Sequence, residues 1–360
     1  MYSASQVGWI TSLETCITVL GSVFVGRIFD IFGPTVLLMC GTVVMVFGVM
    51  MTSLCEQYYQ FILAQGVCTA LGAALLFNPC ISSLGSWFIK KRATALGIAN
   101  AGSSLGGIVI PIIFRRVQER AGFGWGVRSI GFVMLFFSLI ACMTVSSRLR
   151  SPGRQKLEFK RSYIQPFFRE PSFGVAGLAV FFGYWGLFIP ITYVPSHAVA
   201  HGFSQNLSSY LISIQNAGSC AGRVVPGLLA DKVGRFNMYV FGLFLSAVLT
   251  AGLWIPASSH VAIIFYAALY GFSSGIALTL WQPMIAEISP IQDVGARLGA
   301  VSAFQSFSSL LGVPVAGAII DSNNGKYWGA ATFAAIMMCT AGTVAMIAKI
   351  MITKNPFSIK

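Results

Sequence analysis

The sequence GRIFDIFG (residues 26–33) recurs as GLLADKVG (residues 227–234). Both copies read GxxxDxxG, and their matching residues lie 201 positions apart. A second pair, Leu96-Gly97 and Leu298-Gly299, matches at an offset of 202. One copy of so short a pattern means little, but two matches at nearly the same offset indicate two homologous halves.

Long apolar segments surround both copies of the motif. Of the 360 residues, 56% are hydrophobic and only 9% are charged, whereas about a quarter of the residues in a soluble domain are charged. So few charges cannot cover the surface of a water-soluble protein of this length, but they suit a chain whose outer surface faces lipid. We therefore predict an all-α, polytopic integral membrane protein embedded in a lipid bilayer.

Eleven segments qualify as transmembrane helices, because each offers about 20 mostly apolar residues. They are too long for strands and lack the alternation of a barrel wall. The segments are 7–27, 35–54, 59–88, 93–114, 129–146, 172–194, 208–230, 238–257, 262–283, 298–320 and 327–349.

The longest polar gap, residues 147–171, is a basic linker. It divides the chain into an N-terminal bundle of five helices (1–146) and a C-terminal bundle of six (172–360). Of the 23 Lys and Arg residues, 18 fall on the side of this linker, and cytosolic loops carry such an excess. We predict a cytosolic C-terminus and a plasma-membrane location. The same asymmetry explains the net charge of +13, so we expect no nucleic-acid partner.

The position of the motif differs between the two halves. In the second half GxxxDxxG follows the second predicted helix, and in the first half it follows the first. If the halves are homologous, we expect a design of six plus six helices that lacks its first helix.

The motif suits a gate between two bundles. Glycines let helices approach closely, and an aspartate can cap a helix N-terminus or pair with a cation. We predict a gate that opens as the bundles rock, the alternative being a simple short turn. Its residues would be Gly26, Asp30, Gly33, Gly227, Asp231, Gly234, Lys90, Lys91 and Arg92.

These motifs resemble those of the major facilitator superfamily, whose members carry such a sequence after the second helix of each half. The segment WFIKKRATALGIANAGSSLG (residues 87–106) is similar to the signature that precedes the fifth helix of monocarboxylate transporters. The phrase Tyr58-Tyr59-Gln60-Phe61 resembles the fungal monocarboxylate-permease-like branch. That branch includes a riboflavin transporter and efflux proteins encoded beside secondary-metabolite genes. The resemblance implies the major facilitator fold of two related bundles, but it does not fix the substrate.

The resemblance also implies a substrate site on the eighth helix of the family. There an arginine receives the substrate carboxylate, and an aspartate precedes it by four residues. Arg223 fits the arginine, but Ser219 occupies the aspartate position. Because the aspartate is absent, the resemblance does not imply a proton relay through that pair.

Two ionisable residues within the apolar segments are candidates for chemistry. Arg223 lies in the segment 208–230, and a buried guanidinium binds carboxylates well. We predict that Arg223 anchors an anionic solute, the alternative being an arginine that snorkels to the interface. Glu14 lies in the first segment and is our candidate for proton coupling, with a structural hydrogen-bonding role as the alternative.

Several polar and aromatic residues within the segments are predicted to line a solute path, although helix packing explains each equally well. They are Asn78, Tyr184, Trp185 and Gln282. The prolines after Asn78 and Gln282 are expected to kink their helices. His197, His201 and His260 are expected in exposed loops near helix ends, the alternative being a role in pH sensing.

The sequence contains no P-loop and no metal-ligand spacing, so we expect no cofactor. An enzyme would need a cluster of acid and base groups, and Glu14 and Arg223 are isolated in the sequence. We predict a secondary active transporter that works by alternating access. Its substrate would be a small organic anion, either monocarboxylate-like or a secondary metabolite, and coupling to protons is one option. The alternative is a non-transporting membrane sensor or an inactive truncated transporter.

Overall fold

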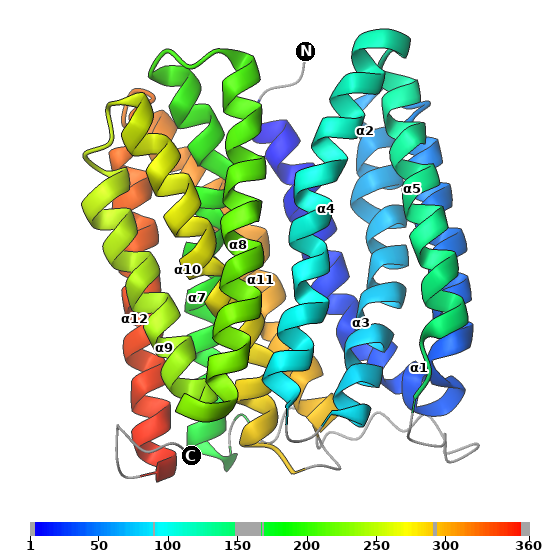
Figure 1. Ribbon diagram of the computed structural model, residues 1–360, viewed down its shortest axis with the longest axis vertical. Helices are drawn as coiled ribbons and strands as arrows, with labels where there is room; N and C mark the ends of the chain where they lie inside the picture. The colour runs from blue at the N-terminus through cyan, green and yellow to red at the C-terminus, as the bar shows by residue number, and fades with distance from the viewer. Residues whose placement is uncertain (1–3, 89–90, 148–166, 168, 291–293, 354–360) are drawn as a thin grey trace. The chain divides into compact units, whose positions relative to one another are not determined.

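The computed structural model describes residues 4–88, 91–147, 167, 169–290 and 294–353, and these residues form helices joined by short turns (Figure 1). The elements are α1 (Ala4–Thr52), α2 (Tyr58–Phe61), the π-helix η1 (Ile62–Thr69), α3 (Ala70–Trp87), α4 (Arg92–Ala121), α5 (Phe123–Thr144), α7 (Pro171–Ala200), α8 (Gln205–Val233), α9 (Arg235–Leu249), the π-helix η3 (Thr250–Trp254), α10 (His260–Glu287), α11 (Val294–Ser322) and α12 (Trp328–Thr353).

Ten helical segments within the described residues are long and apolar enough to cross a membrane, and they coincide with ten of the eleven predicted segments. The eleventh, 208–230, forms most of α8, which at 29 residues is long enough to span. Its hydropathy is lower because it contains Gln215, Asn216 and Arg223. The prediction of an all-α polytopic membrane protein is therefore confirmed.

The helices form two compact units. Unit 1 comprises residues 1–89, 110–163 and 295–310, and unit 2 comprises residues 90–109, 164–294 and 311–360. The first part of α4 thus belongs to the unit that is built mainly from the second half of the sequence. The bundle boundaries at 146 and 172 stay predictions, because most of the linker 147–171 lies outside the described residues.

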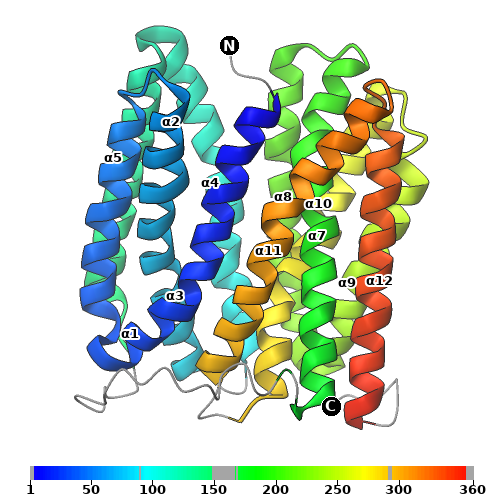
Figure 2. The ribbon, with the colours of Figure 1, turned by 180° about the vertical axis from the view of Figure 1, so that it is seen from behind.

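In unit 1, α1 bends into two arms (Figure 2). The bend lies at Gly33, whose φ of 73° is a conformation that glycine adopts without strain, and Pro34 follows it. Helical geometry continues through residues 26–32, so the interruption between the first two predicted helices is shorter than expected. Both arms pack against η1 and α3, where Gly21 approaches Ala74 and Gly48 approaches Thr69.

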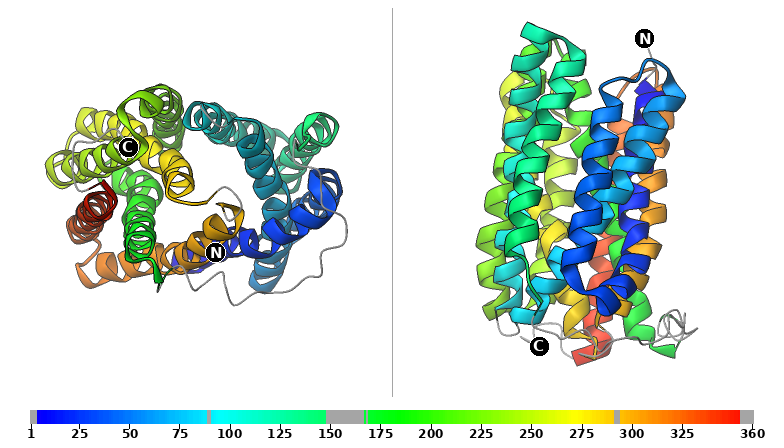
Figure 3. Two further views of the ribbon diagram at one scale, coloured as in Figure 1. Left: turned by 90° about the horizontal axis from the view of Figure 1, so that it is seen from below. Right: turned by 90° about the vertical axis from the view of Figure 1, so that its right-hand side faces the viewer.

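The helices of unit 2 run side by side along a common direction (Figure 3), and α8 packs closely against α10 at glycines of both helices. Gly218 and Gly222 of α8 face backbone atoms of α10, including those of Phe272. Reciprocally, Gly271 and Gly275 of α10 face backbone atoms of α8. Small residues spaced by four let helix backbones approach closely in a membrane. The side of α8 that carries Gly218 and Gly222 is therefore covered by α10, and only its other sides can contact other helices.

We expect that replacing Gly222 with alanine lowers stability by about 1–3 kcal/mol, because the added Cβ would overlap the carbonyl oxygen of Phe272 and push the helices apart. Thermal denaturation of the purified protein in detergent measures the effect. Gly252→Ala is the control, since no atom lies within 4 Å of a Cβ built at that exposed glycine. Equal midpoints for the two variants would contradict the packing argument.

One expectation about the histidines is wrong. His197 was expected in an exposed loop, but α7 continues to Ala200, beyond the predicted end at Val194. His197 therefore lies in a helix with 5% of its surface exposed. His201 and His260 are exposed as expected, but His260 is the first residue of α10 and does not belong to a loop.

Candidate functional site

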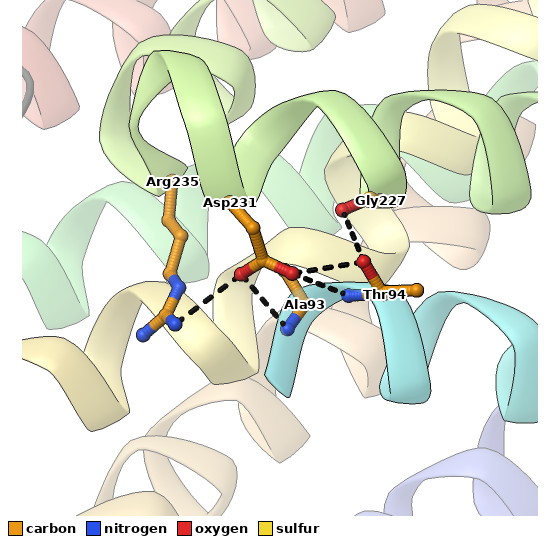
Figure 4. Close-up of polar contacts among 5 residues, drawn as sticks. All are labelled: Ala93, Thr94, Gly227, Asp231 and Arg235. Carbon is orange, nitrogen blue, oxygen red and sulfur yellow. Dashed lines mark hydrogen bonds and ion pairs between the residues drawn. The ribbon is translucent and has the colours of Figure 1, made fainter. Parts of the chain in front are cut away.

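The carboxylate of Asp231, at the end of α8, caps the N-terminus of α4 within unit 2 (Figure 4). Its Oδ2 atom accepts hydrogen bonds from the backbone N–H (3.1 Å) and the hydroxyl (2.9 Å) of Thr94. Its Oδ1 atom accepts from the N–H of Ala93 at 3.4 Å and pairs with the guanidinium of Arg235 at 3.3 Å. The N–H groups of the first helical turn lack partners in the helix and carry partial positive charge. A carboxylate there stabilises both the helix end and its contact with α8.

Glycines let α4 and α8 approach closely enough for this cap. A Cβ at Gly97 would lie 2.5 Å from the carbonyl oxygen of Arg223, and a Cβ at Gly227 would lie 3.1 Å from that of Ala93. Gly234, with φ of 103°, ends α8. The chain then turns into α9, whose first residue is Arg235. The GxxxDxxG pattern therefore supplies the close approach, the capping group and the turn.

The first copy of the motif shares only part of this geometry. Gly33 breaks α1 as Gly234 ends α8, both with positive φ. A Cβ at Gly26 would meet no atom within 4 Å, in contrast to its counterpart Gly227. The side chain of Asp30 and the whole of Lys90 lie outside the described part of the chain.

The other two basic residues proposed for the gate lie at the start of α4. Lys91 is exposed and precedes the helix, whereas Arg92 is half-buried and close enough to Arg235 for their charges to repel. Both therefore lie near the capped end of α4. The gating roles of all these residues stay predictions.

Further charged groups gather near Asp231, and the sequence analysis did not assign them to a site. Glu287, at the end of α10, lies within electrostatic range of Asp231, Arg235 and Lys349. Lys349 is 3% exposed, and its ammonium donates a hydrogen bond to the side chain of Asn237. In the sequence, Glu287 and Lys349 are distinguished only by their positions near the ends of apolar segments.

Arg223 lies on α8 two turns before Asp231, and its guanidinium points toward α4. One Nη atom donates to the carbonyl oxygen of Asn100 at 2.9 Å and to the hydroxyl of Ser103 at 2.6 Å. The Nε atom donates to the hydroxyl of Ser219 at 3.1 Å. A side chain tied to a neighbouring helix in this way does not extend to the interface, which disfavours the snorkelling alternative. The structure therefore places Ser219 beside Arg223.

The partners of Arg223 are all neutral acceptors. Among the described residues, no carboxylate forms an ion pair with this guanidinium. An unpaired charge at membrane depth is costly, and such residues usually have a functional reason. None of the described partners of Arg223 therefore neutralises its charge.

The aromatic candidates lie in unit 2. Tyr184, 9% exposed, is close enough to Arg223 to interact with its charge, and its ring meets that of Trp281 edge to face at 6.2 Å. Trp185 packs against Phe181 and Phe333 instead. The indole nitrogen of Trp185 is buried and has no hydrogen-bond partner among the described residues. The structure thus brings Tyr184 to Arg223, while Trp185 has a packing environment of its own.

The remaining polar candidates occupy separate places. Gln282 is 8% exposed and lies in α10 beside Pro283. Asn78 belongs to unit 1, and its amide donates to the carbonyl oxygen of Ala74 in its own helix. This bond fits the packing alternative for Asn78.

Glu14 also lies in unit 1, on the first arm of α1. Its Oε2 atom accepts a hydrogen bond at 3.1 Å from the side-chain amide of Gln65, in the π-helix η1. π-helical turns are rare and occur frequently at functional sites. Glu14 therefore has one neutral partner, and no basic residue among the described ones forms an ion pair with it.

A family model and several fungal relatives match this chain over most of its length. The family model of the Major Facilitator Superfamily matches residues 1–260 and, in a second match, residues 176–358. An MFS-type transporter of Gibberella moniliformis is 42% identical over 98% of this chain and 84% of its own length. A fujikurins efflux protein of Gibberella fujikuroi is 38% identical over 98% of this chain and 76% of its own. An aspyridones efflux protein of Emericella nidulans is 38% identical over 97% and 70%, respectively.

Proposed function

Because the chain belongs to the major facilitator superfamily, a family of membrane transporters, we propose that it moves a small organic anion across the membrane and binds it at Arg223. The observation that carries this proposal is the guanidinium on α8, whose described partners are all neutral. A carboxylate on the solute would supply the missing counter-charge by accepting hydrogen bonds from the second Nη group, because Nε and the first Nη already donate to Ser219, Asn100 and Ser103. Tyr184 and Ser219 would border the bound group.

The solute in this proposal is a secondary metabolite that is exported by alternating access across the plasma membrane. Two relatives are named as efflux proteins, for fujikurins and for aspyridones, and this supports export over uptake. A monocarboxylate-like solute is the second candidate, because Arg223 fits the carboxylate-binding arginine of monocarboxylate transporters. The charge asymmetry supports an orientation with the C-terminus in the cytosol.

Reconstitution into proteoliposomes tests this proposal with matched pairs of solutes. Organic carboxylates extracted from the source organism are offered together with their primary amides, which keep the size and shape but lack the charge. We expect flux of at least one carboxylate and none of its amide. Equal flux of both would refute anion recognition. Failure to move any solute, combined with unchanged metabolite export in cells that lack the gene, would favour the non-transporting sensor.

We expect Glu14→Gln to abolish the dependence of flux on a proton gradient, because glutamine keeps the hydrogen bond with Gln65 but cannot exchange a proton. Flux driven by the pH gradient should fall at least about tenfold, while solute exchange without a gradient continues. The control is Glu119→Gln, which removes an exposed carboxylate paired with Arg115. Full gradient dependence in Glu14→Gln would exclude Glu14 from coupling.

A further inference from the structure

The end of unit 2 opposite Asp231 contains a buried histidine surrounded by aromatic rings. His197, near the end of α7, lies 4.3 Å from the ring of His201, 5.1 Å from that of Tyr327 and 6.1 Å from that of Trp254, measured between ring centroids. Trp254, the last residue of η3, is 1% exposed. Neither the cap at Asp231 nor the anion site at Arg223 uses this cluster.

Hydrogen bonds fix where the proton of each neutral imidazole lies. The indole N–H of Trp254 points to Nδ1 of His197 at 3.2 Å. Because an indole nitrogen only donates, Nδ1 must be unprotonated and the proton of His197 must lie on Nε2. Nδ1 of His201 lies 3.0 Å from the carbonyl oxygen of His197. A carbonyl only accepts, so His201 carries its proton on Nδ1.

The bond from Trp254 determines how His197 can respond to acid. His197 can take a second proton only on Nδ1, which would set an N–H against the indole N–H of Trp254 and break the bond.

The other charged and titratable groups near this cluster give His197⁺ no counter-ion. On α7 itself, Tyr193 donates to the carbonyl oxygen of Val313 and interacts with Asp321. The turn between α11 and α12 carries the exposed Lys326 and the phenol of Tyr327. Tyr266 stacks on Trp254, and the exposed His260 is the first residue of α10. Within the described residues, no carboxylate forms an ion pair with His197.

The bond from Trp254 ties α7 to a π-helical turn. In η3 the N–H of Ile255 bonds to the carbonyl oxygen of Thr250, a wider turn than in an α-helix. Trp254 stacks on Tyr266 of α10 with ring centroids 5.7 Å apart. If the bond to His197 breaks, η3 keeps its packing on α10 but loses its polar link to α7. π-helical turns of this kind occur frequently at functional sites.

We propose that His197 is a proton-binding site that locks η3 to α7 when neutral and releases it when protonated. The ligand is the proton itself, delivered through the exposed His201 side of the cluster. The proposal depends on neither the solute nor the direction of transport.

Hydrogen–deuterium exchange on the purified full-length protein in lipid nanodiscs tests the lock. Exchange is followed from about pH 7.5 to about pH 4, below the usual range of histidine, and corrected for the intrinsic pH dependence of amide exchange. In the wild type we expect protection of residues 250–257 to fall about tenfold on acidification and to recover on neutralisation. In His197→Asn this change should disappear, since the asparagine amide oxygen accepts from Trp254 but does not titrate. His260→Asn, at an exposed histidine, should behave as the wild type.

A second variant keeps the proposal falsifiable if His197→Asn does not fold. Trp254→Phe removes the donor, so residues 250–257 should exchange rapidly at both pH values. The lock is refuted if wild-type protection there does not change with pH. It is equally refuted if His197→Asn or Trp254→Phe keeps the wild-type pH dependence.

Discussion

Replacing Arg223 with glutamine is expected to lower solute flux by about a hundredfold or more, at equal amounts of protein in the membrane. The guanidinium is held in place by Ser219, Ser103 and the carbonyl oxygen of Asn100, so it is preorganised and offers its remaining donors to an anion. Losing one partner of a desolvated charge pair costs about 2–5 kcal/mol, or roughly 30-fold to several thousandfold in affinity. The loss should appear in solute binding as well as in flux, because it removes the anchor itself.

Arg223→Lys separates charge from shape. A lysine keeps the positive charge but lacks the planar guanidinium that donates to Ser219, Ser103 and the carbonyl of Asn100 and still has an Nη group for an anion. We expect intermediate flux, with weaker binding than in the parent. The control is Arg128→Gln, which removes one positive charge from unit 1, where Arg128 stacks on Trp125 and bonds to Ser53. Parent-like flux in Arg223→Gln would overturn the proposed site.

The features that could be predicted from sequence are those with a period or a repeat. The lengths of the apolar segments predicted the helices. The duplicated GxxxDxxG pattern coincides with both helix breaks, at Gly33 and Gly234. The ion pair between Asp231 and Arg235 crosses the turn at Gly234 and joins α8 to α9, so a spacing of four along a single helix does not account for it. The Gly218–Gly222 and Gly271–Gly275 spacings are a further signal in the sequence, because small residues four apart favour close helix pairs.

Other parts of the site leave no such signal. The guanidinium of Arg223 bonds to the backbone carbonyl of Asn100, and every residue carries a carbonyl, so residue type cannot announce this contact. The burial of His197 depends on how far α7 continues and on what packs there, which composition does not determine. The π-helical turns η1 and η3 result from local packing and have no characteristic residues.

Asp231→Asn is expected to lower flux by about tenfold or more while solute binding is retained. The amide keeps the size of the carboxylate, but it loses the negative charge that faces the N-terminus of α4 and Arg235. Its NH₂ group would also turn a donor toward either Arg235 or the N–H groups of Ala93 and Thr94. Because Arg223 is untouched, affinity should change little, and the defect should appear in turnover.

Losing the helix cap in Asp231→Asn should lower the free energy of unfolding by only about 0.5–2 kcal/mol. If Asp231 also acts in the gate, flux should fall by more than this loss of folded protein explains. Asp231 is 11% exposed and Arg235 17%, so a folded protein with a modestly lower melting temperature is expected. Flux normalised to folded protein then separates the two roles. If normalised flux equals that of the parent, Asp231 is a structural cap and no gate. Lys232→Gln, on the next and exposed residue of α8, should change neither stability nor turnover. We predict a gate at this point because the same carboxylate holds the start of α4 to the end of α8, so a movement that separates them must break its hydrogen bonds together.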